Sequence, residues 1–170
     1  MAFQTATPSS PSPRVAAAWR LLETLTDPEI PVVSLREMGI LRDVLETPDG
    51  QLEVVITPTY SGCPAMSQIE SDVRSTLERA GLGARVVTRL SPAWTTDWMD
   101  ASAREKLRAW GIAPPAAGAG LRGACVSDAP SPMRFMRQAA RPALVACPRC
   151  GSDNTTETSH FGSTACKALY

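Results

Sequence analysis

The sequence predicts an α+β fold, a two-layer α/β sandwich in which helices cover one face of a three-stranded mixed sheet. Three observations support this prediction: a helical apolar stripe in residues 14–26, two β-prone runs joined by an Asp-Gly turn, and a second helical stripe after residue 63. The elements follow in the order helix, hairpin, helix, strand, helix. One sheet with its helices on a single face buries all of these stripes, and a linker and a truncated zinc-ribbon-like tail are expected to follow it.

The first predicted elements are a helix and a β-hairpin. Within residues 14–26, apolar side chains recur at spacings of three and four, which is the pattern of one helix face. Residues 27–31 end this helix, because proline provides no amide hydrogen and disfavours helical geometry in the residue before it. The runs 40–45 and 52–56 are short and β-prone, and residues 47–50 between them hold the Asp-Gly pair typical of a hairpin turn.

The remaining predicted elements are a helix, a strand and a helix. Residues 66–77 have helical apolar spacing, and Gly81 can close that helix in the left-handed conformation. Residues 85–90 are predicted as the third strand. Asp100 is expected to cap a last helix that Gly111 ends. The apolar face of that helix comprises Ala103, Leu107 and Trp110.

Length and composition set the domain organisation and exclude some classes of function. The 170 residues are expected to form a disordered tail at 1–13, a folded domain at 14–112, a Pro/Gly/Ala-rich linker at 113–143 and a Cys-rich segment at 144–170. The 17 basic and 17 acidic residues balance, which argues against electrostatic binding to nucleic acid or to a membrane surface. The sequence has neither a signal-peptide pattern nor a bilayer-spanning apolar run, so a cytoplasmic location is expected. Thiols stay reduced there, and the five cysteines therefore suggest metal or thiolate chemistry.

Cys63 is the first candidate site residue. It follows a predicted strand and precedes a predicted helix, with Pro64 suited to the first helical position. Unpaired amides and the helix dipole at such a place favour the thiolate, which is the form that binds iron or attacks a persulfide. The alternative is a small buried apolar side chain, as most lone cysteines are. Ser67 and Glu70 also fit a capping box, in which case the helix begins later and Cys63 lies in the loop.

Polar side chains near these elements are further candidates. Asp27 and Glu29 flank a proline and can place carboxylates beside the thiol, as metal ligands or to tune its pKa. The alternative is a polar turn between helix and strand, which the sequence alone favours. Thr57, Thr59 and Ser61 precede the cysteine, and their hydroxyls can position a ligand or satisfy the turn.

Two tryptophans, Trp94 and Trp98, stand four residues apart after the third predicted strand. They are candidates for covering the thiol or for contacting a partner, because aromatic side chains anchor interfaces. Packing in the core is at least as good an explanation.

The Cys-rich segment resembles half of a zinc site. Cys147 and Cys150 have the spacing of a metal knuckle, and a closed structural zinc site needs four ligands. Only His160 and Cys166 remain downstream, so the site is either truncated or assembled from these four residues, and truncation is favoured. A thioredoxin-like dithiol is disfavoured, because the pair follows a linker and not a strand of a βαβ unit.

Three segments together resemble the signatures of a small iron–sulfur-assembly domain family, which includes bacterial maturation factors and the cytosolic iron–sulfur targeting proteins of eukaryotes. These segments are residues 27–31 with 38–40, residues 57–64, and residues 92–96. The resemblance covers about residues 14–112. It implies that Cys63 matches the family's reactive cysteine, and that Cys63, Asp27, Glu29 and Thr57 form a site for transfer of a transient iron–sulfur cluster or iron.

The tail is similar to that of one branch of this family, the D subunits of bacterial ring 1,2-phenylacetyl-CoA epoxidase systems, which serve aerobic phenylacetate degradation. Residues 147–152 and 161–170 carry the similarity. Members of the branch usually continue past the final tyrosine with another Cys-x-x-Cys. This sequence lacks that pair, so zinc at Cys147, Cys150, Cys166 and His160 is expected from a ribbon that is truncated.

The resemblance implies an auxiliary protein and not an enzyme. It would mature or repair the iron–sulfur or di-iron centre of the epoxidase, with the iron–sulfur reductase or the di-iron oxygenase as partner. A second copy of the chain is another candidate partner, because one thiolate cannot satisfy a cluster that four normally hold. The chain is not the oxygenase itself, since a carboxylate-bridged di-iron site needs Glu-x-x-His pairs and only one histidine is present. The alternative function is a non-catalytic docking subunit in which Cys63 is structural.

Overall fold

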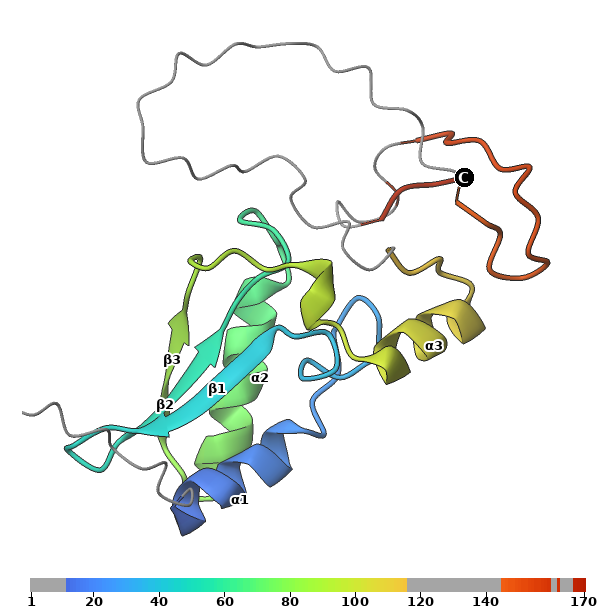
Figure 1. The fold of residues 1–170 in the computed structure, drawn as a ribbon. Coiled ribbons are helices and arrows are strands. Elements are labelled where there is room, and N and C mark those ends of the chain that lie inside the picture. The colour runs from blue at the N-terminus through green and yellow to red at the C-terminus, as the bar shows by residue number, and fades with distance from the viewer. Residues whose placement is uncertain (1–11, 116–144, 160–161, 163–166) are drawn as a thin grey trace, which may run out of the picture. The chain divides into compact units, whose positions relative to one another are not determined.

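The computed structural model describes residues 12–115, 145–159, 162 and 167–170 (Figure 1). The chain divides into two compact units, the N-terminal unit Met1–Trp94 and the C-terminal unit Thr95–Tyr170. The N-terminal unit contains α1 (Pro13–Leu22), β1 (Leu41–Glu46), β2 (Leu52–Ile56), α2 (Met66–Arg79) and β3 (Ala84–Thr88). None of the helices in the described part of the chain is long and apolar enough to span a membrane.

The sheet has the strand order β1-β2-β3, with β2 in the centre. β1 pairs with β2 in antiparallel fashion, and β2 pairs with β3 in parallel fashion. A hairpin links the antiparallel pair, whereas the parallel pair is linked by α2, because a parallel connection has to cross from one end of the sheet to the other. The predicted three-stranded mixed sheet is therefore confirmed.

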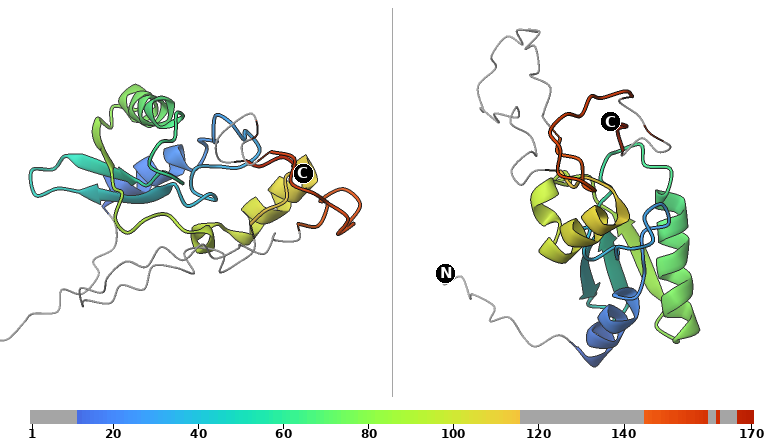
Figure 2. Two further views of the ribbon diagram at one scale, coloured as in Figure 1. Left: turned by 90° about the horizontal axis from the view of Figure 1, so that it is seen from above. Right: turned by 90° about the vertical axis from the view of Figure 1, so that its right-hand side faces the viewer.

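Both helices cover the same face of the sheet. Alternate residues of a strand point to opposite faces, so Leu52 and Ile56 share one face with their neighbours in register, Glu46 and Thr88. Arg14 of α1 pairs with Glu46 at 3.0 Å, and Thr88 donates a hydrogen bond of 2.7 Å to Glu70 of α2. The left view of Figure 2 shows α2 lying along one side of the sheet. The predicted two-layer architecture is confirmed.

Apolar side chains from both helices and from the central strand fill the space between these layers. The largest fully buried side chains are Leu22, Val33, Leu35, Leu52, Val54, Ile56, Ile69, Val73 and Leu77. They include Ile69, Val73 and Leu77 of the apolar face predicted for the helix after residue 63, whereas Met66, the fourth predicted position, is half-buried. Burial of a large aliphatic side chain contributes about 1.5–3 kcal/mol, so this core is the main source of stability for the sheet and its helices.

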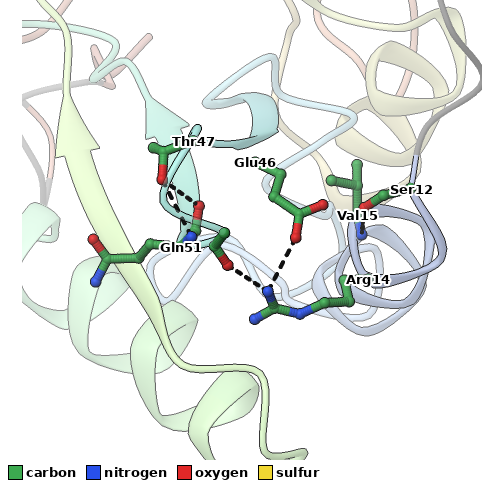
Figure 3. Close-up of polar contacts among 7 residues, drawn as sticks. Ser12, Arg14, Val15, Glu46, Thr47 and Gln51 are labelled. Atoms are coloured by element: carbon green, nitrogen blue, oxygen red, sulfur yellow. Dashed lines mark hydrogen bonds and ion pairs between the residues drawn. The ribbon is translucent and has the colours of Figure 1, made fainter.

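Polar contacts attach the start of α1 to the hairpin (Figure 3). Ser12 is the N-cap, and its hydroxyl accepts a hydrogen bond of 3.2 Å from the amide of Val15. Arg14 donates to Glu46 and to the carbonyl of Gly50 in the hairpin turn. Gly50 has φ +76°, a conformation that glycine adopts without the strain of a Cβ atom.

Two predicted helix boundaries in the N-terminal unit were wrong. α1 ends at Leu22 and not at residue 26, because the chain beyond it pairs with another segment: Thr26 forms a β-bridge with Ser34. α2 begins at Met66 and not at Pro64. The capping box is not formed either, because Ala65 occupies the N-cap position and the predicted partner carboxylate of Glu70 bonds to β3.

The C-terminal unit contains a 3-10 helix, η1 (Thr96–Trp98), and α3 (Ala101–Trp110). Asp100 occupies the predicted N-cap position of α3 without a side-chain capping bond, and Gly111 ends the helix at φ +90°, as predicted. Ala103 and Leu107 are buried, but Trp110 is 55% exposed, so its prediction as part of the apolar face was wrong. Trp110 is the last helical residue, and the helix presents it to solvent there.

Candidate functional site

Three segments that are distant in sequence meet at the end of β2 that leads to Cys63. The amide of Thr57, directly after β2, donates a hydrogen bond of 2.8 Å to the carbonyl of Ile40. The indole N–H of Trp94 donates one of 2.9 Å to the carbonyl of Met38. These two bonds join residues 38–40, the segment after β2 and the segment after β3 within the N-terminal unit.

Cys63 lies in the loop between β2 and α2. Its amide donates to the carbonyl of Tyr60 at 3.3 Å, and its own carbonyl accepts from the amide of Met66 at 3.4 Å, so the backbone on both sides of the residue is held in turns. The side chain is half-buried and is not part of a disulfide. Cys63 lies in the loop, as expected for a helix that begins after it, although α2 begins at Met66 and not at the predicted capping box. A thiolate at Cys63 stays a prediction.

Asp27 forms the turn that follows α1. It is only 8% exposed, and its Oδ1 atom accepts hydrogen bonds from the amides of Glu29 at 2.8 Å and Ile30 at 2.9 Å. The Asp27 amide donates to the carbonyl of Val33 at 3.0 Å, which closes the turn from the other side. This geometry is that of a structural polar turn.

The structure does not assemble the predicted carboxylates and thiol into a complete ligand set. Within residues 12–115, 145–159 and the other described positions, no group of three or more His, Cys, Asp or Glu side chains is placed to hold a metal ion. Glu29 is half-buried, and Thr57 is 3% exposed. The roles of Asp27, Glu29 and Thr57 in metal transfer therefore stay predictions.

A pocket of about 220 Å³ adjoins the segment that precedes Cys63. Its lining consists of Thr57, Pro58, Thr59, Tyr60, Ser61, Leu90, Ala93 and Trp94. Gly62 leaves room for the ring of Tyr60 in the pocket wall. A Cβ atom at position 62 would lie only 3.3 Å from Cε2 of that ring. The sequence indicated hydroxyls near the thiol and offered a cover over the thiol as one of three roles for the tryptophans, and the structure places Trp94 in one pocket wall with these hydroxyls. Leu90 and Tyr60 were missed because no local pattern distinguishes them.

The Cys-rich segment has the local geometry of a metal knuckle. Hydrogen bonds from the backbone of Arg149 and Cys150, then from the Cys150 side chain, lower the pKa of the Cys147 thiol, and the Arg149 guanidinium adds a smaller lowering. The Gly151 amide donates to the carbonyl of Cys147 at 2.8 Å, with Gly151 at φ +72°. These contacts favour the thiolate that zinc binds, so the two cysteines fit half of a zinc site. The other two predicted ligands, His160 and Cys166, lie outside the described residues.

Comparison with known proteins assigns the two parts of the chain to two families. Residues 16–88 match the family described as iron–sulfur cluster assembly protein, and residues 131–170 match the PaaD zinc beta ribbon domain. A crystal structure of a domain of unknown function, DUF59, from Bacillus anthracis is similar with a TM-score of 0.50 and 27% identity, over 55% of this chain and 91% of that one. The class of protein is thus an iron–sulfur assembly domain followed by a zinc ribbon.

Full-length relatives narrow this class. A protein of Escherichia coli (strain K12), named as the D subunit of a "Putative 1,2-phenylacetyl-CoA epoxidase", is 43% identical over 159 residues, which is 93% of this chain and 86% of that protein. An "Fe-S protein maturation auxiliary factor" of Porphyromonas gingivalis (strain ATCC BAA-308 / W83) is 34% identical over 52% of this chain and 85% of that protein. The chain belongs to the family of phenylacetyl-CoA epoxidase D subunits, within the wider iron–sulfur assembly family, as its sequence signatures predicted.

Proposed function

We propose that the protein is an auxiliary factor of aerobic phenylacetate degradation that matures or repairs the iron–sulfur or di-iron centre of the phenylacetyl-CoA epoxidase complex. The observation that carries this proposal is the place of Cys63. It lies on the loop after the central strand, where the signature segments meet, in a chain 43% identical to an epoxidase D subunit. The relative named as a maturation auxiliary factor is 34% identical over 90 residues, and residues 16–88 match the iron–sulfur cluster assembly family, which together support maturation over catalysis.

Cys63 is proposed as the transfer ligand. A half-buried thiol on a loop anchored by its backbone can reach a partner and keep its position. A single thiolate fills one of about four positions around a cluster, so the remaining ligands come from a second copy or from the recipient. Such partial ligation is labile, which suits a cargo that has to leave.

Asp27 is proposed to support this site in addition to its turn. Both hydrogen bonds from the turn amides use Oδ1, so Oδ2 is the oxygen available to a proton or to iron. Glu29 and Thr57 complete the proposed transfer set.

In the Cys-rich tail, Cys147 and Cys150 are proposed to hold a structural zinc ion together with His160 and Cys166, and zinc would supply a rigid cross-link there.

The proposed partners are the iron–sulfur reductase or the di-iron oxygenase of the epoxidase, in the cytoplasm, and the chain itself catalyses no reaction. The test is anaerobic reconstitution with iron and sulfide, followed by transfer to an apo component of the epoxidase. Cys63→Ser is expected to lose transfer, whereas Ser67→Ala, an exposed substitution on α2 that does not line the pocket, is expected to retain it.

The same experiment addresses the alternative function, a docking subunit with a structural Cys63. If Cys63→Ser passes on iron as well as the wild-type chain, and complex formation and epoxidase activity are intact, the maturation role is refuted and docking remains. Loss of transfer with co-purification preserved supports maturation.

A further inference from the structure

The pocket beside the Cys63 loop shares only Thr57 with the proposed transfer set, and its other lining residues have no role in that set. It lies wholly within the N-terminal unit and has a volume of about 220 Å³. Residues 57–61 form one part of its wall and run directly into the segment that carries Cys63. Leu90, Ala93 and Trp94, from the segment after β3, form the other part.

The lining defines the chemistry of the occupant. None of the eight lining residues is charged: four carry hydroxyl groups and four are apolar. A charged group placed here would lose hydration without gaining a counter-charge, which is costly. A group with an apolar body and hydrogen-bonding capacity at its edge or its backbone fits both parts of the wall.

The size of the pocket limits the occupant further. Pockets for drug-sized ligands have about 300–1,000 Å³. At about 220 Å³ this pocket is smaller and matches one large side chain. Leu90 is 59% exposed beside it, an apolar surface that a bound partner would cover. Buried aromatic side chains are the usual anchors of protein interfaces.

The walls are held in place before any partner binds. The indole of Trp94 is fixed by its hydrogen bond to the carbonyl of Met38, and the ring of Tyr60 packs against the backbone at Gly62. A preformed pocket saves the cost of ordering side chains on binding.

We propose that this pocket is the docking site for one uncharged aromatic side chain of the protein that receives the metal centre. This inference rests on the proposed function and adds the chemistry by which the recipient is recognised. An aromatic anchor held between residues 57–61 and Trp94 brings the recipient surface to the loop of Cys63, so docking and transfer occur side by side.

Binding of a free probe tests the chemistry of the pocket. The full chain is labelled with ¹⁵N and titrated with N-acetyl-L-phenylalaninamide, and with N-acetyl-L-lysinamide as the charged control. Saturable shifts are expected for the Trp94 indole signal and the amides of residues 57–61 with the phenylalanine probe alone. An equal response to the lysine probe, or shifts elsewhere only, would overturn the proposal.

Variants connect the pocket to the partner. Leu90→Ser is expected to weaken co-purification with the epoxidase recipient roughly tenfold, as loss of one anchoring apolar contact does. Leu45→Ser is the matched control, because Leu45 is also exposed, at 41%, and does not line the pocket. Ala93→Phe fills the pocket and is expected to abolish both probe binding and co-purification.

The outcomes separate this inference from the proposed function. Cys63→Ser is expected to bind the probe and the recipient normally while losing transfer. If Ala93→Phe blocks the probe but leaves co-purification intact, the pocket binds a small molecule and the protein-docking inference is refuted. If Leu90→Ser and Ala93→Phe both behave as the wild-type chain, no anchor binds here, and the role of Cys63 is unaffected.

Discussion

Replacement of Asp27 separates a structural role of this carboxylate from a role in transfer. Its Oδ1 atom accepts two amide hydrogen bonds, from Glu29 and from Ile30, and the Ile30 residue is only 6% exposed. Hydrogen bonds to a charged group contribute about 1.5–3 kcal/mol each, and they are not fully additive. Asp27→Ala removes the acceptor of both hydrogen bonds and leaves a buried amide unpaired, so we expect the free energy of unfolding to fall by about 2–4 kcal/mol.

Asp27→Asn is the informative companion, because it keeps an acceptor oxygen but loses the charge. Neutral hydrogen bonds are about half as strong as charge-assisted ones, so the expected loss is about 1 kcal/mol. For a unit of this size, 1 kcal/mol corresponds to a Tm change of about 4–8 °C. Asp43→Ala serves as the surface control, since Asp43 is exposed and accepts only a bond from the next amide; we expect a change of about 0.5 kcal/mol.

Urea unfolding followed by circular dichroism measures these differences, and iron transfer is then compared at a temperature where every variant is folded. A folded Asp27→Asn chain that transfers no iron would establish a carboxylate role beyond the turn. Full transfer by the same variant would exclude that role. An Asp27→Ala chain as stable as the wild type would refute the structural reasoning itself.

Three further predictions follow from single contacts. Trp94→Phe leaves the carbonyl of Met38 without its donor and is expected to lower the free energy of unfolding by about 1–3 kcal/mol in urea. Trp110→Phe, at an exposed position, should change it by no more than about 0.5 kcal/mol. Equal effects of the two substitutions would contradict the role of the hydrogen bond. The pKa of Cys147 is lowered, so its thiolate persists at lower pH. In chelator-treated protein, the pH midpoint of Cys147 alkylation by iodoacetamide should therefore fall below 9.0, and it should rise again when urea unfolds the chain. Ser12→Ala is expected to lose about 1 kcal/mol through the N-cap of α1, and Ser12→Asp to restore it; a thermal melt of the two variants decides this.

Elements set by local chemistry could be predicted from the sequence. The bounds of β2 agree with its prediction, because a run of apolar β-branched residues is enclosed by turn residues on both sides. Gly81 and Gly111 follow their helices at φ +69° and +90°, as expected of residues that tolerate the left-handed conformation. Such signals act within a few residues, so they need no knowledge of the fold.

What escaped prediction depends on contacts between distant segments. The early end of α1 reflects the bridge between Thr26 and Ser34, which local helix propensity cannot indicate. The role of Trp94 depends on a hydrogen bond across 56 positions, to Met38. The spacing of four between Trp94 and Trp98 was compatible with packing in the core, with covering the thiol and with contacting a partner. Only the folded chain shows that Trp94 forms part of a pocket wall.

Under the proposed function, a partner would complete the ligands around Cys63. The residue lies after the central strand, and hydrogen bonds from Thr57 and Trp94 join the neighbouring segments to residues 38–40. Yet the described residues supply no further set of ligands around this thiol. Under the proposed function, this chain alone would bind a cargo at Cys63 weakly, and another protein that supplies further ligands would strengthen that binding. Docking at the adjoining pocket would make that completion specific to the recipient.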